Sequence, residues 1–223
     1  MMMRFTPVLV LTTLSLTSCG SMNPAKETAR IRAVHASPDA PDVDICVNGT
    51  AAFIDVAFPG TTQYATVEEG TYQIRVVAAG DGCEGGGVID ATLPLPADSD
   101  TTVVALDFLT QIEPLVLQDD NSAPAMDMAK VRFVHASPDA PAVDITLTDG
   151  TTLFDDVSFK EVASYIEAPA GTLDLEVRDE TGTAVVLTLE DVTLAAGTVY
   201  TIYAIGLLEG EPTLDALITA DNG

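Results

Sequence analysis

Two segments of the sequence each contain the residue types of a hydrolase triad within five positions. The first set is His35, Ser37 and Asp39, and the second is His135, Ser137 and Asp139. In a serine hydrolase the histidine takes the proton of the serine hydroxyl, the aspartate orients the histidine, and an oxyanion hole lies opposite. Three side chains so close together in one strand and turn rarely converge in this way. We therefore expect no enzyme and keep an envelope hydrolase using these HxSxD segments as the alternative function.

The same residues belong to an octapeptide, VHASPDAP, which occurs at Val34–Pro41 and again at Val134–Pro141. Its Ser-Pro-Asp-Ala-Pro part is typical of a turn. Pro38 presets the φ angle at the second turn position, Asp39 can bond its own backbone, and Pro41 excludes a helix beyond it. The octapeptide therefore predicts a rigid corner between two strands.

We expect the histidine of each corner to lie at the rim of the core. There His35 is predicted to bond a backbone group of the corner or a carboxylate, with Asp39 and Asp44 as candidates, because buried polar groups need partners. The equivalent residues of the second copy are His135, Asp139 and Asp144. We expect these six residues to stabilise the corners, and we keep a weak role in ligand binding as the alternative.

Metal and cofactor sites have little support in the sequence. The two histidines fall one in each copy, so neither copy offers a multi-histidine site. The acidic loops that could attract calcium are Asp98–Asp100, Asp119–Asn121 and Asp155–Asp156. None matches an EF-hand or a glycine-rich calcium repeat. The glycine-rich Gly80–Gly87 lacks the lysine and following helix of a phosphate loop. We expect no metal site and no cofactor, and leave adventitious calcium binding open.

The elements that position these residues are repeated. Val34–Ile45 and Val134–Ile145 differ only at Asp42 and Ala142, and the similarity continues over about ninety residues. Each copy is long enough to form a core of its own. The predicted boundaries are a signal peptide (1–18), a lipidated tether (19–29), a first repeat (30–118), a linker (119–129) and a second repeat (130–223). Since the linker is polar, substitutions in different repeats are expected to act additively.

Each copy contains the pattern of strand after strand. Apolar residues alternate with polar ones at Tyr72–Val76 and at Leu173–Val177, which indicates half-buried strands. Thr101–Phe108 and Thr198–Ile205 are more continuously apolar and fit central strands. Asn48-Gly49 and Asp149-Gly150 are hairpin turn signals. We predict an all-β chain of two tandem antiparallel β-sandwich domains with immunoglobulin-like architecture, and keep a small barrel as the alternative.

The N-terminal residues have the layout of a leader. Arg4 precedes the apolar run Phe5–Leu16, and the run ends in Leu-Thr-Ser-Cys at Cys19. This ending resembles a lipobox and predicts acylation of Cys19; an ordinary secretory leader is the alternative. Gly20 follows in place of an inner-membrane retention aspartate. We expect an exported protein that is lipid-anchored to the bacterial cell envelope, at the outer membrane.

Two further cysteines lie in the first repeat. An exported chain meets an oxidising environment, so Cys46 and Cys83 are predicted to form a disulfide. Neither cysteine has a second thiol or a histidine at metal-ligand spacing.

The charge of the chain limits its partners. Its 34 acidic and 9 basic residues give a formal net charge of −25. A field of this sign repels phosphate backbones, so we exclude nucleic acid as a partner. The expected partners are the membrane, through the lipid anchor, and a protein or glycan ligand.

The arginine-led strand, the long VHASPDAPxVDI motif and the following Gly-Thr strand resemble domain of unknown function 4397. The resemblance covers Ala29–Gln118 and Ala129–Gly223. The resemblance implies an exported β-rich module of a kind that occurs, often in tandem, in bacterial lipoproteins and cell-surface proteins. It implies no activity. We therefore expect a non-enzymatic envelope protein that presents two β-sandwich modules for binding or structural roles.

Overall fold

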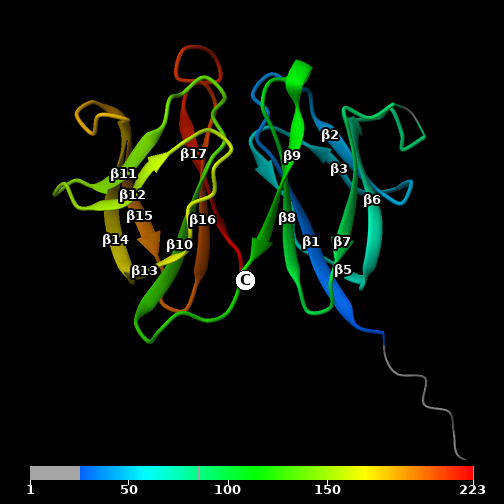
Figure 1. Cartoon of the computed structure of the whole chain (residues 1–223), viewed down its shortest axis with the longest axis horizontal. Helices are drawn as coiled ribbons and strands as arrows, with labels where there is room; N and C mark the ends of the chain where they lie inside the picture. Colours follow the sequence, from blue (N-terminus) through cyan, green and yellow to red (C-terminus); the bar gives the residue numbers. More distant parts are fainter. Residues whose placement is uncertain (1–25, 85, 223) are drawn as a thin grey trace, which may run out of the picture.

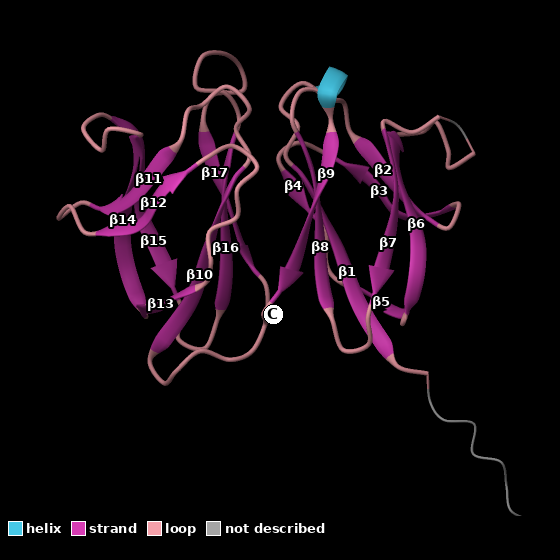
Figure 2. Ribbon diagram, viewed as in Figure 1, coloured by secondary structure: helices cyan, strands magenta, loops and turns pink. Residues whose placement is uncertain are grey.

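The computed structural model describes residues 26–84 and 86–222 of the chain. These residues form seventeen β-strands and one short 3-10 helix, arranged as two β-sandwich modules (Figures 1 and 2). The prediction of an all-β chain with tandem sandwiches is confirmed. Each module consists of two separate sheets, which excludes the small barrel. The described part of the chain contains no helix that is long and apolar enough to cross a bilayer.

The first module has an inner sheet in the order β4-β1-β8-β9, with β5 also paired to β1, and an outer sheet in the order β3-β2-β6-β7. Its elements are β1 (Thr28–His35), β2 (Val43–Val47), β3 (Thr50–Val56), β4 (Gly60–Thr61), β5 (Ala65–Glu68), β6 (Gly70–Ala78), β7 (Ile89–Leu95), β8 (Asp100–Leu106), η1 (Leu109–Gln111) and β9 (Glu113–Asp119).

The second module repeats this plan, with an inner sheet β13-β10-β16-β17 and an outer sheet β12-β11-β14-β15. Its strands are β10 (Met128–His135), β11 (Val143–Leu147), β12 (Thr152–Val157), β13 (Ile166–Pro169), β14 (Gly171–Asp179), β15 (Val185–Leu194), β16 (Val199–Ile205) and β17 (Asp215–Ala220). Asp119 and Met128 therefore lie within strands, and the connection between the modules is residues 120–127.

One strand pair in each module corrects the prediction of purely antiparallel sheets. β1 pairs with β8, and β10 with β16, in parallel. Parallel neighbours need a long crossover connection. Here the crossover is the outer sheet itself, because the chain leaves β1, forms β2, β3, β6 and β7, and returns as β8.

The hairpin signals act as predicted in the first module. Asn48 and Gly49 both have positive φ angles, 49° and 78°, as a type I′ turn requires. They join β2 to β3. In the second module the loop at Asp149-Gly150 closes through a hydrogen bond of 2.8 Å from Leu147 N to Thr151 O.

The inner sheets are buried on both faces. Ile31 and Val103 point into the core of the first sandwich, whereas the alternate residues Val34 and Val104 point the opposite way and are equally buried. Those alternate residues belong to a separate cluster that contains both modules: Val34, Ala36, Val104, Leu106 and Leu117 from the first, and Val134, Ala136, Tyr203 and Ile205 from the second. We call the surface along which the two inner sheets meet the seam.

The four sheets therefore stack as outer, inner, inner and outer layers (Figure 1). The connection between the modules is also fastened. Asn121 Nδ2 donates to Asp100 Oδ2 at 2.8 Å, and Lys130 Nζ donates to Ser122 Oγ at 2.8 Å. Each module has a core of its own, and the two modules also share a core along the seam, so the chain forms a single block.

Candidate functional site

Each octapeptide is the corner between the first inner strand and the first outer strand of its module. His35 is 1% exposed, and its Nε2 lies 3.0 Å from the carbonyl oxygen of Pro41. Because a carbonyl only accepts, Nε2 carries the proton, and Nδ1 accepts from the backbone N–H of Ser37 at 3.4 Å. In the second copy, His135 Nε2 lies 2.9 Å from the carbonyl oxygen of Pro141. Each histidine closes its own corner.

The aspartates of the octapeptides hold the loop that follows the second inner strand. Asp39 accepts from Leu109 N at 2.6 Å, at the start of η1. Asp139 accepts from Leu208 N at 2.7 Å and from Glu209 N at 2.9 Å. Both carboxylates satisfy backbone N–H groups that have no partner within a sheet.

Asp44 and Asp144 support the irregular hairpin of the outer sheet. Asp44 accepts from Asp55 N at 2.9 Å and from Gly80 N at 3.1 Å. Asp144 accepts from Asp156 N at 2.8 Å. Asp55 and Asp156 both have a φ of 52°, next to a shift in the strand register. The two carboxylates therefore stabilise a left-handed bulge residue at the same position in each module.

The structure does not assemble a triad from these segments. Among the described residues, Ser37 Oγ has no hydrogen-bond partner. Ser137 Oγ donates to the carbonyl oxygen of Gly206 at 2.8 Å. Nε2 of each histidine bonds a proline carbonyl, His135 Nδ1 has no partner among the described residues, and the aspartates bond loop N–H groups. Ser137 Oγ also lies 3.3 Å from Asp139 Oδ1, but neither side chain hydrogen-bonds His135, so no path for a proton from serine through histidine to aspartate is formed.

Burial makes the two corners sensitive to pH. It lowers the pKa of His35 and His135 below the ordinary value of 6.5, although the proline carbonyls act in the opposite direction. The unfolded chain therefore takes up protons more readily than the folded chain. The histidines contribute stability above pH about 6.5, and that stability is lost as the pH falls through the folded-state pKa values.

We expect the urea midpoint of the protein to fall between about pH 7.5 and about pH 5.5, where few carboxylates titrate. A variant with both His35→Gln and His135→Gln serves as the control, because glutamine does not ionise. Its midpoint should be lower at all pH values but nearly constant over this interval. An equally steep decline in the variant would show that other groups cause the pH dependence.

Cys46 and Cys83 form the predicted disulfide, with 5.7 Å between their Cα atoms. The bond attaches the glycine-rich loop after β6 to β2, and Arg75 Nη1 donates to the carbonyl oxygen of Cys83 at 2.9 Å. The second module uses other chemistry at this position. There Arg178 Nε donates to Thr146 Oγ1 at 3.2 Å.

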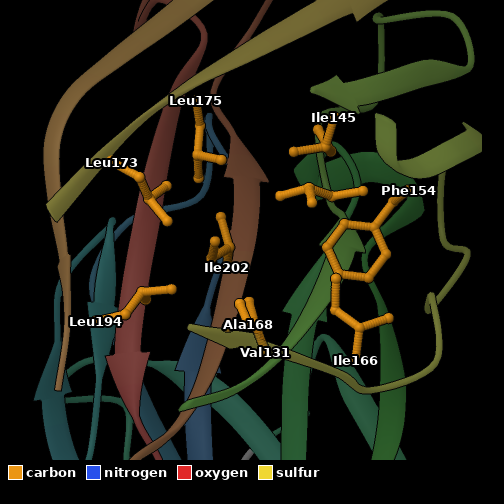
Figure 3. Close-up of a pocket in the computed structure, with 10 residues that line it drawn as sticks. Val131, Ile145, Phe154, Ile166, Ala168, Leu173, Leu175, Leu194 and Ile202 are labelled. Atoms are coloured by element: carbon orange, nitrogen blue, oxygen red, sulfur yellow. The ribbon is translucent and has the colours of Figure 1, made fainter. Parts of the chain in front are cut away.

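The predicted lipidation site, Cys19, lies outside the described residues. Within residues 26–84 and 86–222, no group of three or more histidine, cysteine or acidic side chains is placed to hold a metal ion. A cavity inside the second sandwich, beside Phe154, Leu175 and Ile202, measures only about 20 Å³ and has an entirely apolar lining (Figure 3). Such a void is too small for more than one water molecule and carries no binding chemistry.

The seam contains a charge network that sequence reasoning missed. Arg32 donates from Nε to Thr102 Oγ1 at 2.7 Å and from Nη2 to Asp221 Oδ1 of the other module at 2.6 Å. Arg132 repeats the arrangement, with Nε bonded to Thr201 Oγ1 at 2.8 Å and Nη2 bonded to Asp119 of the first module. The side chains of both arginines and both aspartates are at most 3% exposed. Each module thus supplies the counter-ion for the buried arginine of the other.

Tyrosines complete the network. The guanidinium carbon of Arg32 lies 4.7 Å from the centre of the Tyr64 ring, and that of Arg132 lies 4.8 Å from the Tyr165 ring. Burial opposes the charge on Arg32, but Tyr203, Asp221 and Tyr64 outweigh it and raise the arginine pKa. Burial raises the pKa of Tyr203 to about 12. Arg32 is therefore charged and Tyr203 neutral near neutral pH.

The two ends of the seam are not equivalent. Lys160 Nζ reaches across it to Asp107 Oδ2 at 2.6 Å and to Glu113 Oε1 at 2.8 Å. The positions that correspond to Lys160 and Asp107 in the other module are Pro59 and Gly206, which cannot form this ion pair. The ion pair therefore needs one first module and one second module. A seam between two first modules or between two second modules would lack it.

A polar cavity opens at one side of the seam and spans both modules. It has a volume of about 260 Å³ and is lined by Arg32, Thr61–Tyr64 and Ile218–Ala220. We call it the seam cavity. Arg32 and three residues of the edge strand β17 belong to its lining. Among the described parts of the chain, this is where a buried charged group and unpaired strand backbone line the same cavity.

The sequence holds a weak signal for this region. Arg32 and Arg132 stand at matching positions within apolar strands, on the face opposite each sandwich core, which indicates a second buried face. Their partners are harder to find. The sequence pattern places Asp119 in the linker, and Asp221 follows the last strand, 189 positions from Arg32.

The chain was compared with protein families, curated proteins and solved structures. The family described as "Domain of unknown function (DUF4397)" matches residues 29–146 and 146–223. The chain therefore belongs to this family, and the predicted resemblance is confirmed. No curated protein matches the sequence.

Several solved structures are distantly similar. The C-terminal domain of AlgF from P. aeruginosa is 22% identical, with 44% of this chain and 99% of that chain covered and a TM-score of 0.32. A family CBM26 module of Eubacterium rectale Amy13K, in complex with maltoheptaose, is 8% identical over 85% of this chain and 96% of that chain, with a TM-score of 0.26. The TIE protein of Bacillus anthracis is 9% identical over 80% of this chain and 34% of that chain, with a TM-score of 0.25. At these TM-scores none of the three carries an argument about function.

Proposed function

We propose that the chain is a non-enzymatic lipoprotein of the cell envelope that serves as a binding platform built from two joined modules. The observation that carries this proposal is the use of the repeated polar residues. In both octapeptides the histidine and aspartate side chains bond backbone groups, which leaves them to shape the corner and not a reaction site.

The direction of the strands supports display away from a membrane. β1 begins at Thr28, so it takes up the last two residues of the predicted tether (19–29), and it ends at His35 in the first corner. β10 runs the same way in the second module, so both corners lie at the end of the block opposite the entry of the chain (Figure 1). An anchor at Cys19 then leaves both corners facing away from the membrane. The partner in this proposal is a protein or a glycan.

The anchor is tested by Cys19→Ala in cells that produce the protein. We expect the wild-type chain to incorporate labelled palmitate and to fractionate with membranes. The variant should incorporate none and remain as the uncleaved precursor, because the acceptor thiol is missing. Normal cleavage and release of the Cys19→Ala variant would show an ordinary secretory leader and remove the anchor from the proposal.

The absence of catalysis is tested with the purified mature chain and a panel of ester and glycoside substrates. We expect no turnover above that of a buffer control. Turnover that disappears in the His35→Ala and His135→Ala double variant would replace the binding platform with a hydrolase. Turnover that survives in this variant would point to a contaminating enzyme, since the HxSxD segments contain both histidines of the chain.

A further inference from the structure

The free edge of β17 presents unpaired backbone groups to the seam cavity. Asp221 N donates to Val199 O at 2.8 Å, and the register pairs Tyr200 with Ala220. In an antiparallel pair, successive residues bond the neighbouring strand alternately. The N–H and C=O groups of Ile218 and Ala220 therefore point away from β16, and both residues line the cavity.

Arg32 adds a free donor to the same cavity. Its Nε and Nη2 atoms are bonded to Thr102 and Asp221, while Nη1 makes no hydrogen bond to any residue in the described part of the chain. The equivalent atom at the other side of the seam is engaged, because Arg132 Nη1 donates to the carbonyl oxygen of Gln118 at 3.2 Å. Gln118 is the residue of β9 that corresponds to Ala220 of β17. At the β9 side of the seam, Arg132 thus occupies the backbone carbonyl of the edge strand. At the β17 side, the edge strand and Arg32 Nη1 are both left without this bond.

We propose that the seam cavity binds an extended peptide segment of a partner protein, which adds as a strand to the free edge of β17. This inference rests on the proposed binding function and names its partner class. Ile218 and Ala220 offer donors and acceptors two residues apart, a spacing of about 7 Å that a second strand matches. A carbonyl group of the peptide accepts from Arg32 Nη1, and the exposed side chain of Ile218 lies beside the edge.

The observations favour a peptide over a sugar or a small anion. A sugar hydroxyl can bond Arg32, but it does not repeat the two-residue spacing of the strand edge. A small anion meets the carboxylate of Asp221 beside Arg32 and a net charge of −25 on the chain. The same charge selects a neutral or basic peptide.

The test uses a phage-displayed library of random twelve-residue peptides, selected on the immobilised mature chain. Selected peptides are synthesised and their Kd values measured by calorimetry. Ala220→Pro removes an outward N–H inside the cavity. Ala216→Pro is the control on the same strand outside the cavity, and it removes an outward N–H that bonds Asp215 Oδ1 at 2.7 Å. We expect Ala220→Pro to weaken binding about tenfold and Ala216→Pro to leave it unchanged.

A second measurement leaves the protein intact, in case Ala220→Pro does not fold. Each backbone nitrogen of the best peptide is methylated in turn. Strand addition predicts that methylation weakens binding at every second residue only. Failure to select any peptide, or equal loss at all positions, or full binding by a folded Ala220→Pro variant, would overturn the inference. Such a result leaves the lipoprotein proposal standing, because acylation of Cys19 is measured separately.

Discussion

Asp221→Ala is expected to lower the free energy of unfolding by about 3–5 kcal/mol, although the residue lies near the end of the chain. The substitution leaves the guanidinium of Arg32 buried at the seam without its carboxylate. It also removes the acceptor of Thr201 Oγ1 and Thr219 Oγ1. Urea denaturation of the mature chain measures the change.

Two controls separate the buried pair from surface charge. The double variant Arg32→Met with Asp221→Leu should recover most of the loss, because an apolar pair of similar volume can replace a buried ion pair. Glu68→Ala removes the partner of Lys26 in an exposed pair and should leave the midpoint unchanged. The single variants Asp221→Ala and Arg32→Met are measured separately. If the double variant loses as much free energy of unfolding as these two single variants lose in sum, the pairing across the seam is contradicted.

Loss of the disulfide is the second large effect. Replacing both Cys46 and Cys83 with alanine removes a cross-link between residues 37 positions apart. In the chain-entropy model a loop of this length stabilises the folded state by about 4 kcal/mol. We expect the first module to lose this stability, as measured by hydrogen exchange of the β6 amides.

The second module provides the comparison for this effect, because Thr146 and Arg178 occupy the corresponding region without a disulfide. Amides of β14 should lose less protection than those of β6 in the cysteine variant, because β14 belongs to the outer sheet of the other module and is coupled to the disulfide only through the seam. Equal loss in β6 and β14 would mean that the disulfide acts on the whole block and not on its own module.

Local features of the fold could be predicted because their causes lie within a few residues. Asn48-Gly49 adopts the positive φ angles of a tight hairpin, and the alternation at Tyr72–Val76 places Ile74 and Val76 in the core. The corner at Val34–Pro41 follows from its two prolines and its aspartate. The pairing of Cys46 with Cys83 follows from the predicted export of the chain and from the cysteine count.

The seam could not be predicted in the same way. A strand pattern shows that Val34 and Val104 are apolar, but it does not show what covers them. The parallel pairing of β1 with β8 depends on a crossover through the whole outer sheet. The exchange of Asp119 and Asp221 between modules joins residues that no local pattern relates.

The central claim is that the two modules form one block through the seam, and hydrogen exchange on Asp221→Ala tests it most directly. The substitution lies in the second module, and its unpaired arginine lies in the first. Amides of both β8 and β16 should lose protection relative to the wild-type chain, because each module loses the stabilisation that the other provides. A loss confined to β16, with β8 protected as in the wild type, would contradict the shared block.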